Sequence, residues 1–213
     1  MLVRMDYSYK MIIGICGFEG AGKDTVANYL VAHYGFTKLS FAAVLKDITA
    51  ALFDWPRALL EGDSAESRSW REVVDPWWAE KLGMPGFTPR LALQLLGTNV
   101  FRQHFHSDIW LFALERRFQK YKHVVVSDCR FPNEIAMIQK LGGQVWRVDK
   151  KEKPVWYDDY VYRQIVPVGV HPSCYMWIQC TYNLVLLNHG DLDHLYSHIK
   201  KYVEDHVPTL KDA

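Results

Sequence analysis

The chain lacks several features that mark particular classes of protein. Its formal net charge is only +1 at pH 7, so it has no basic excess of the kind that nucleic-acid-binding proteins carry. No apolar run approaches the roughly 18 residues of a membrane-spanning helix. The opening segment "MLVRMDYSYK" has no apolar core of the kind that signal peptides need. We therefore expect a cytoplasmic protein that has neither a nucleic-acid partner nor a membrane partner.

Paired cysteines and metal-ligand motifs are also missing. The chain has four cysteines and no CxxC spacing, and Cys16 and Cys129 fall in or beside predicted core strands. We expect reduced thiols, which are typical of intracellular proteins. His194 and His198 stand four residues apart on a predicted helix, but Leu195 occupies the position where a zinc-protease motif has Glu. We expect these histidines to be ordinary surface residues of the helix.

Strand-like and helix-like segments alternate along the chain, which predicts a parallel sheet covered by helices. A length of 213 residues with 49% hydrophobic content suits one globular domain with a small insertion. Residues 54–87 are rich in Trp, Pro, Gly and charge and read as the insertion; residues 150–170 are aperiodic, and we expect them to be mobile. Strands are predicted at about 11–16, 37–41, 123–128, 144–148 and 182–188, and helices at about 23–34, 42–53, 89–104, 107–120, 132–142 and 192–204.

The stretch "IIGICGFEGAGKDT" predicts a phosphate-binding loop. Gly17, Gly22 and Lys23 have the GxxxxGK spacing, and they lie between a predicted strand and a predicted helix, as such a loop requires. Glycines let backbone N–H groups turn toward a phosphate, and the start of the helix adds favourable partial charge. The alternative is an ordinary glycine-rich turn.

Asp24 stands where such loops normally carry Ser or Thr, whose hydroxyl helps to hold Mg²⁺. Two interpretations stay open for this residue: it serves the metal directly or through water, or its charge merely stabilises the helix N-terminus. Asp128 ends a predicted buried strand, where a carboxylate orients Mg²⁺ in phosphate-loop folds; the alternative is a cap for the helix at Pro132. Arg130 follows at the carboxyl edge of the sheet, where ligands bind, unless it is a plain surface arginine.

Arginines and tryptophans gather between the loop and this strand. Arginine matches phosphate oxygens, and the flat face of tryptophan can stack on a base. Each signal is weak alone, because arginines on helices are usually solvated and tryptophans usually pack, but together they suggest an acceptor site. The residues are Arg57, Arg68, Arg71, Arg90 and Arg102, with Trp55, Trp70, Trp77, Trp78 and Trp110.

Five stretches in this order give the chain a resemblance to a known family: "GFEGAGKDT", "EGDSAESRSWRE", "TPRLALQLLGTNVFRQHFHSDIW", "SDCRFPNE" and "HPS". Over about residues 12–188 the chain resembles bacteriophage-type deoxynucleoside monophosphate kinases. The resemblance implies an α/β, three-layer P-loop nucleotide-kinase fold with a central parallel five-stranded sheet, a helical acceptor-binding insertion and a lid. Residues 1–213 would form one kinase domain, with a core at about 11–53 and 107–205, the insertion at about 54–106 and the lid at about 150–170.

The resemblance further implies ATP as phosphoryl donor, Mg²⁺ as cofactor and small-molecule nucleotides as substrates. Lys23, Arg130 and Asp128 would be catalytic, and Asp24 and Asp128 would hold the metal. The ATP phosphates would contact Gly17, Gly20, Ala21, Gly22, Lys23, Asp24 and Thr25, and the acceptor would contact Lys46, Arg68, Arg71, Arg90, Gln94, Gly97, Thr98, Trp110, Arg130 and Glu134.

The chain departs from the family pattern in two places. Cys174 follows "HPS" here, whereas the family pattern has an acidic residue at that position, and the closing segment "NHGDLDHL" is also altered. Two other functions stay open: a kinase for another phosphorylated metabolite, such as phosphomevalonate or dephospho-coenzyme A, and a nucleotide-binding switch. The tryptophans and the "LGT" block speak against the first, and the lack of an NKxD motif gives the second no support. The sequence leaves the preferred base and the choice between monomer and homodimer open; a viral source would place the protein in the host cytoplasm.

Overall fold

The computed structural model describes residues 11–206; residues 1–10, which we expected not to form a signal peptide, and residues 207–213 lie outside the described part. The chain divides into two compact units. The first, here called the sheet unit, runs to Ser40 and resumes at Arg117; the second, the helical unit, is Phe41–Arg116. The predicted insertion, residues 54–106, falls inside the helical unit.

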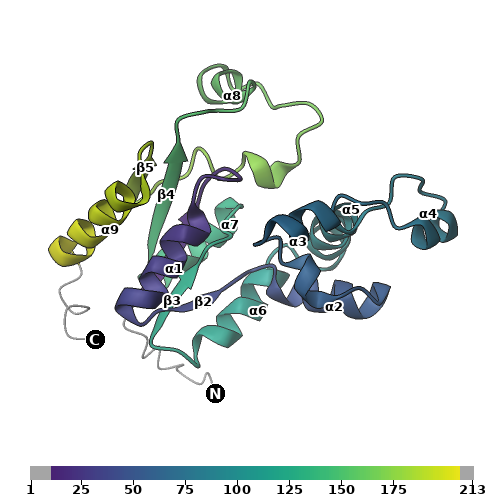
Figure 1. The fold of residues 1–213 in the computed structure, drawn as a ribbon, viewed down its shortest axis with the longest axis horizontal. Coiled ribbons are helices and arrows are strands. Elements are labelled where there is room, and N and C mark those ends of the chain that lie inside the picture. The colour runs from purple at the N-terminus through teal and green to yellow at the C-terminus, as the bar shows by residue number, and fades with distance from the viewer. Residues whose placement is uncertain (1–10, 207–213) are drawn as a thin grey trace. The chain divides into compact units, whose positions relative to one another are not determined.

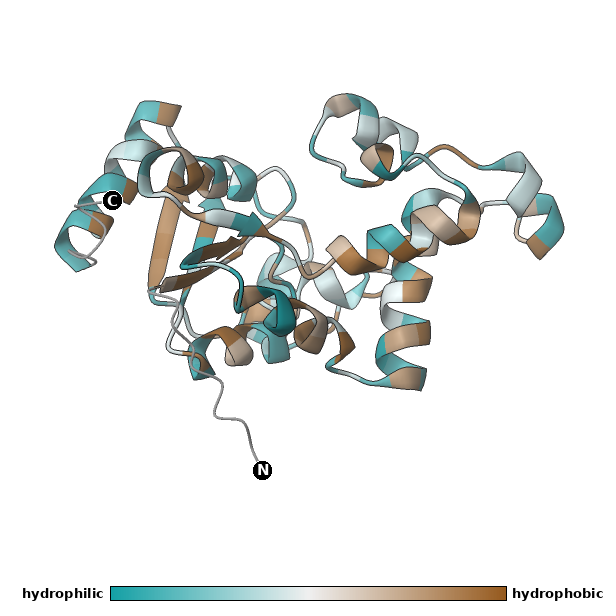
Figure 2. Ribbon diagram, turned by 90° about the horizontal axis from the view of Figure 1, so that it is seen from below, coloured by the Kyte–Doolittle hydropathy of each residue, from teal (hydrophilic) through white to brown (hydrophobic). Residues whose placement is uncertain are grey.

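The sheet unit is built on five parallel strands (Figure 1) in the order β2-β3-β1-β4-β5. This arrangement confirms the predicted parallel sheet. The interior strands β1 and β3 are almost entirely buried, because helices cover both faces of the sheet, and Figure 2 shows the strands as largely hydrophobic. The strands are β1 (Met11–Cys16), β2 (Thr37–Leu39), β3 (His123–Val126), β4 (Gln144–Lys150) and β5 (Leu184–Asn188).

The strand register brings three chain segments to one edge of the sheet. Gly14 of β1 pairs with Val126 of β3, and Leu39 of β2 pairs with the same Val126. The segments that follow β1, β2 and β3 therefore emerge side by side at the carboxyl edge. Connections run in opposite directions from β1 and from β3, which makes this edge the switch point where ligands bind in open α/β sheets.

Helices cover the two faces of the sheet. α1 (Lys23–Tyr34) packs on β1 and β3, α9 (Leu192–His206) packs on β5 and α1, and α7 (Pro132–Lys140) packs on β1 and β4 from the opposite face (Figure 1). All three were predicted. None of the helices between residues 11 and 206 combines the length with the apolar composition that crossing a bilayer requires.

The connection between β4 and β5 contains the short helix α8 (Tyr157–Arg163) and the 3₁₀ turn η3 (Pro172–Cys174). We expected an aperiodic segment here. Helix α8 buries none of its residues, so the sequence has no apolar stripe that would reveal it. All four cysteines of the chain are free thiols, and Cys16 and Cys129 are buried.

The helical unit has a hydrophobic core of its own, formed by Phe53, Trp55, Leu60, Ala79, Phe87 and Ala92. Its short helices α3, α4 and α5 are capped at their N-termini by Ser64, Asp75 and Thr88, and the side chain of each cap accepts a hydrogen bond from a backbone N–H of the first turn. The elements are α2 (Ala43–Phe53), η1 (Arg57–Leu60), α3 (Ala65–Trp70), α4 (Pro76–Leu82), α5 (Pro89–Gln94) and η2 (Leu95–Phe105), and α6 (Ile109–Phe118) continues into the sheet unit.

One predicted helix changes character midway. Residues 89–104 were expected to form a single α-helix, but the α-helical hydrogen bonding ends at Gln94 and η2 is a π-helix. The change coincides with "GTNV", residues 97–100, a run of four residues that are all weak α-helix formers. Gly97 also lies very close to α2, because a Cβ there would be 2.7 Å from Leu45 Cδ2.

Adjacent leucines of β5 allow a test of how much the buried face of the sheet contributes to stability. Leu186 is 1% exposed, whereas Leu187 on the opposite face is 46% exposed. Leu186→Ala should lower the free energy of unfolding by about 2–5 kcal/mol, because it leaves a cavity. Leu187→Ala should change it by less than about 1 kcal/mol. Denaturant unfolding of both variants checks this, and equal losses would contradict the burial pattern.

Candidate active site

The predicted phosphate loop joins β1 to α1 at the carboxyl edge of the sheet. Gly22, whose φ is +97°, is the N-cap residue of helix α1, and no side chain caps the first turn of the helix. The side-chain Nδ2 of Asn188, at the end of β5, donates to the carbonyl of Ala21 at 2.9 Å. A Cβ at Gly22 would lie 2.7 Å from the same nitrogen. Asn188 thus holds the loop in place from the end of β5. The free backbone N–H groups at the uncapped start of α1 suit an anion.

Lys23 bends back over the loop. Its Nζ donates to the carbonyls of Gly17 at 2.9 Å and Phe18 at 2.7 Å. Burial, together with the positive charge of Arg130, lowers the pKa of Lys23 to about 8. The ammonium group is therefore poorly solvated and lies close to a second cation, an arrangement that favours an incoming anion.

The other predicted loop residues have less direct roles in this structure. The backbone N–H of Ala21 donates to the carbonyl of Phe18 at 3.2 Å, and its side chain is fully buried. Thr25 lies on the first turn of α1, where it is partly buried. Gly20 has a φ of +74° and space around its Cα.

The segment after β3 carries the predicted Asp128 and Arg130. Asp128 Oδ2 accepts a hydrogen bond from Ser40 Oγ at 2.7 Å, which ties the ends of β2 and β3 together. Glu134 is 2% exposed and its Oε2 accepts from the backbone N–H groups of Arg130 at 2.7 Å and Phe131 at 3.1 Å. We predicted Glu134 as a substrate contact; its contacts here hold the turn that presents Arg130.

The positive charge of Arg130 lowers the pKa of two other groups at this edge of the sheet. It contributes to the lowered pKa of Lys23, and it adds to the effect of burial in lowering the pKa of His171. His171 belongs to the "HPS" segment, where its Nδ1 contacts Ser173 Oγ at 2.8 Å. Lys23, Arg130 and the "HPS" segment are therefore brought together in the sheet unit.

Asp24 is bound by side chains that the sequence did not single out. Its Oδ1 accepts from Ser127 Oγ at 2.8 Å and forms an ion pair with Lys38 Nζ at 2.8 Å. Burial by itself would raise the pKa of Asp24, but the hydrogen bonds from Lys38 and Ser127 and the charge of Lys38 hold it below its ordinary value.

The two carboxylates of this edge suit Mg²⁺, which prefers oxygen ligands and is commonly held by one or two carboxylates together with substrate phosphates. Asp24 contacts Ser127, the neighbour of Asp128 in the chain, so both predicted metal residues lie at the same edge. No group of three or more His, Cys, Asp or Glu side chains that could hold a metal ion is found in residues 11–206.

The predicted lid is joined to the loop by an aromatic cluster. Phe18 is 6% exposed, and its ring meets Trp156, Tyr157 and Trp177 edge-on, with centroid distances of 6.0, 5.8 and 4.9 Å. Lys150 Nζ also donates to the carbonyl of Glu19 at 3.0 Å. A movement of residues 150–157 would therefore change contacts of the phosphate loop directly.

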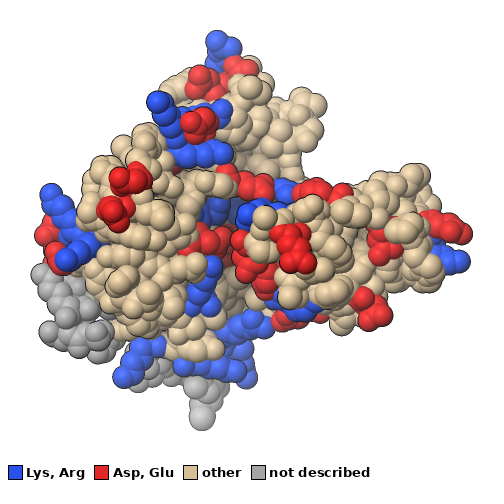
Figure 3. Space-filling view, in the orientation of Figure 1, with Lys and Arg blue, Asp and Glu red and all other residues tan. Residues whose placement is uncertain are grey.

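In the helical unit, several predicted acceptor residues surround the turn formed by residues 61–63. Lys46 Nζ pairs with the Glu61 carboxylate at 2.6 Å and also donates to the Glu61 carbonyl, and Arg68 donates to the Asp63 carbonyl at 3.0 Å. The Arg71 guanidinium lies against Gly62. Figure 3 shows acidic and basic side chains intermingled where α2 and α3 lie.

Arg90 is linked to the same group through the backbone. Its N–H donates to the carbonyl of Arg71 at 3.0 Å, and its guanidinium pairs with Glu72 at 2.7 Å. Lys46, Arg68, Arg71 and Arg90 are therefore gathered in one part of the helical unit, and Lys46, Arg68 and Arg90 are each engaged with a carboxylate or a backbone carbonyl.

The remaining predicted acceptor residues lie at the junction of α5 and η2. Gln94 ends α5, and Gly97 and Thr98 are in the first turn of the π-helix. Trp110 is 4% exposed, and its indole N–H donates to the carbonyl of Gly97 at 2.9 Å. In this structure Trp110 supports the π-helix, and its role as an acceptor contact stays a prediction.

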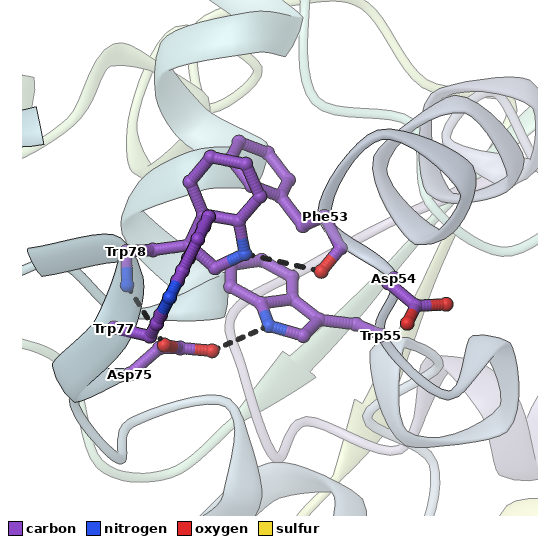
Figure 4. Close-up of a pocket in the computed structure, with 6 residues that line it drawn as sticks. All are labelled: Phe53, Asp54, Trp55, Asp75, Trp77 and Trp78. Atoms are coloured by element: carbon purple, nitrogen blue, oxygen red, sulfur yellow. Dashed lines mark hydrogen bonds between the residues drawn. The ribbon is translucent and has the colours of Figure 1, made fainter. Parts of the chain in front are cut away.

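Most of the tryptophans expected to offer stacking faces are used for packing. Trp55 stacks on Phe53 at 4.5 Å, and its Nε1 donates to Asp75 at 2.8 Å. Trp78 meets Phe53 edge-on. Only Trp77 of the residues in this group is largely exposed, at 57%. Figure 4 shows the surface pocket, of about 370 Å³, that these side chains and Asp54 line.

Sequence reasoning missed Lys38, Ser40, Ser127, Phe18 and Asn188. Each acts through a contact between segments far apart in the chain, so no local motif marks it. One signal was readable: Ser127 and Ser40 both stand at predicted strand ends on the edge where ligands bind.

No family model matches the chain. Among curated proteins, it is 31% identical over 209 residues to a protein of Acanthamoeba polyphaga mimivirus that is provisionally named a deoxynucleotide monophosphate kinase, covering 92% of this chain and 97% of that one. It is 26% identical over 182 residues to the deoxynucleoside-5'-monophosphate kinase of Escherichia phage T5, covering 61% of this chain and 72% of that one.

Solved structures with a similar outline include a dephospho-CoA kinase from Campylobacter jejuni, at 13% identity and a TM-score of 0.45, covering 91% of this chain and 96% of that one. A protein of Thermus thermophilus has the same TM-score of 0.45 at 19% identity, covering 93% of this chain and 99% of that one. With TM-scores below 0.5, neither likeness adds to the functional assignment.

The contacts of Glu134 predict a large difference between two substitutions. Glu134→Ala should lower the free energy of unfolding by about 1–3 kcal/mol, because it leaves the buried N–H groups of Arg130 and Phe131 without their acceptor. Glu134→Gln should be much milder, since its amide oxygen can accept both bonds. Thermal and denaturant unfolding of the two variants checks this, and equal losses would show that the carboxylate charge, not the capping, is what matters.

Proposed function

Because the chain belongs to the deoxynucleotide monophosphate kinase family, we propose that it transfers the γ-phosphoryl group of ATP to a deoxynucleoside 5′-monophosphate, which yields ADP and the diphosphate. The observation that carries the proposal is 31% identity across 92% of the chain, with a phosphate loop at the switch point of the sheet. The diphosphate product would contribute to the supply of DNA precursors.

The donor half of the reaction falls to the sheet unit. The uncapped first turn of α1 would receive the phosphates of ATP, with Gly17, Gly20 and Gly22 letting the backbone approach. Lys23 would exchange the carbonyls of Gly17 and Phe18 for phosphate oxygens, and Arg130 would neutralise charge on the transferred group. The partly desolvated state of Lys23 supports this role, because an anionic partner would relieve it.

The acceptor half falls to the helical unit. Arg68, Arg71, Arg90 and Lys46 would hold the monophosphate, and Gln94, Gly97 and Thr98 would contact the nucleoside. The acceptor oxygen belongs to a phosphate dianion, so no strong general base is required and positioning dominates the rate. This fits a site that offers cations and no catalytic His–Asp pair.

Mg²⁺ bound by Asp128, with Asp24 as the second carboxylate, would supply neutralisation of charge on the donor phosphates. The lid would exclude water, which otherwise competes with the acceptor. Its contact with the loop through Phe18 supports this, because closing of residues 150–170 would act on the segment that holds the phosphates.

ADP release from ATP, measured with Mg²⁺ against a panel of ribo- and deoxyribonucleoside monophosphates, tests the function. We expect turnover with one or a few deoxynucleotides, and a loss of at least about 100-fold for Lys23→Ala, which removes the main charge at the transferred group. Circular dichroism should show that the Lys23→Ala variant is folded.

Absence of turnover with every nucleotide, alongside measurable ATP binding, would point to another phosphorylated metabolite or to a nucleotide-binding switch. Full activity of the Lys23→Ala variant would exclude the loop as the donor site.

Arg90→Ala separates the acceptor from the donor. We expect kcat/KM for the acceptor to fall by about tenfold to a hundredfold, because a charge-assisted hydrogen bond to phosphate is lost. The dissociation constant of ATP should change little. Arg116→Ala, which removes an exposed arginine of α6, is the matched control and should alter neither. A larger effect of Arg90→Ala on ATP binding than on acceptor use would mean that the acceptor site is misplaced.

A further inference from the structure

The ion pair between Lys38 and Asp24 belongs to a chain of polar contacts beside the phosphate loop. Asp24 Oδ1 receives both Lys38 Nζ and Ser127 Oγ at 2.8 Å. Lys38 Nζ also donates to Asn28 Oδ1 at 3.2 Å, one turn further along α1. The four side chains come from α1, from the edge strand β2 and from the segment after β3, so three separate parts of the sheet unit meet at this carboxylate.

A carboxylate at the position of Asp24 creates an electrostatic problem for a nucleotide site. The residue follows Lys23 directly and stands in the first turn of α1, where the donor phosphates would lie. A Ser or Thr hydroxyl at this position is neutral, whereas Asp24 carries a negative charge and would repel the phosphates at close range. Something in the structure must compensate for that charge if the loop is to bind ATP.

Lys38 is placed to provide this compensation. It neutralises Asp24 from the side of β2, and Ser127 fixes the carboxylate by a second hydrogen bond to the same oxygen. The other charge that acts on Asp24 from its own helix is that of Lys23. With its cation directed at the phosphates, Lys23 would not compensate for the carboxylate as well, so a second lysine is needed.

We propose that Lys38 is a positioning residue of the donor site, which holds and neutralises Asp24 so that a carboxylate can replace the usual hydroxyl without repelling the nucleotide. The proposal rests on the ATP site proposed above. It gives Lys38 no contact with the substrate; the lysine acts only through Asp24. Lys38 and Ser127 both contact Oδ1 of Asp24, so Oδ2 of the same carboxylate can still face the Mg²⁺ proposed above.

An ordinary exposed ion pair would contribute little. The side chains of Lys38 and Asp24 are 33% and 59% exposed, so burial does not set this pair apart, but two further contacts do. The lysine has a second acceptor in Asn28, which restricts its conformation. Asp24 has a second donor in Ser127, which fixes the oxygen that the lysine contacts.

A double-mutant cycle tests the proposal. Lys38→Met, Asp24→Asn and the double variant are compared by the dissociation constant of a non-hydrolysable ATP analogue, measured by calorimetry with and without Mg²⁺. Lys38→Met should weaken binding by about tenfold in the wild-type chain, but by much less when Asp24 is already the neutral Asn. Lys38→Arg keeps the charge and should restore most of the affinity.

The matched control is Lys200→Met, which removes a lysine paired with Glu204 at 3.9 Å on α9; it should leave ATP affinity unchanged. Equal losses from Lys38→Met in both backgrounds would overturn the proposal, because the lysine would then act on the nucleotide itself. No loss in either background would overturn it too. A wild-type chain that binds no ATP analogue would instead remove the proposed function, and this inference with it.

Discussion

The register of β1 against its neighbours is the constraint on which the donor side of the molecule depends. It places the phosphate loop, the end of β2 and the segment after β3 at one edge. Gly14 shows how tightly this is fixed, because a Cβ there would lie 2.4 Å from Ile138 Cδ1 and 2.9 Å from Cys129 Sγ. A slip of one residue would turn every side chain of β1 to the opposite face, and Asp24 would no longer meet Ser127.

Charge at this edge is balanced locally rather than by the chain as a whole. The net charge of the chain is +1, and the cations needed for phosphate are supplied at single points. Asp24 is paired with Lys38, and Asp128 accepts a hydrogen bond from Ser40. The negative charge of Asp24 also acts on Lys23, where it offsets part of the lowering of the lysine pKa by burial and by Arg130.

The sheet and the loop could be predicted because their signals are local. Apolar runs mark β1 and β3, and the glycine spacing with Lys23 marks the loop. The ion pair of Asp24 with Lys38 could not be predicted, because it depends on β2 lying beside β3 after a helix and a turn. Helix α8 was not predicted, because it buries no residue and so has no apolar stripe. The end of the α-helix at Gln94 was not predicted either, because Leu91 and Leu95 continue the helical period. The four weak helix formers at residues 97–100 were the only local sign of the change.

The helical unit must build its core from a short stretch of chain, and this decides which of its residues remain for a ligand. Trp55 and Trp78 are consumed by packing on Phe53, so the number of tryptophans overstated the surface that could stack on a base. Lys46, Arg68 and Arg90 are instead held in place by ion pairs and carbonyl contacts. Such a cation is released only to a partner that replaces the lost contact. A doubly charged phosphate can do so, whereas a neutral hydroxyl cannot. If Arg90 holds the acceptor as proposed, its pairing with Glu72 would favour phosphorylated acceptors over free nucleosides.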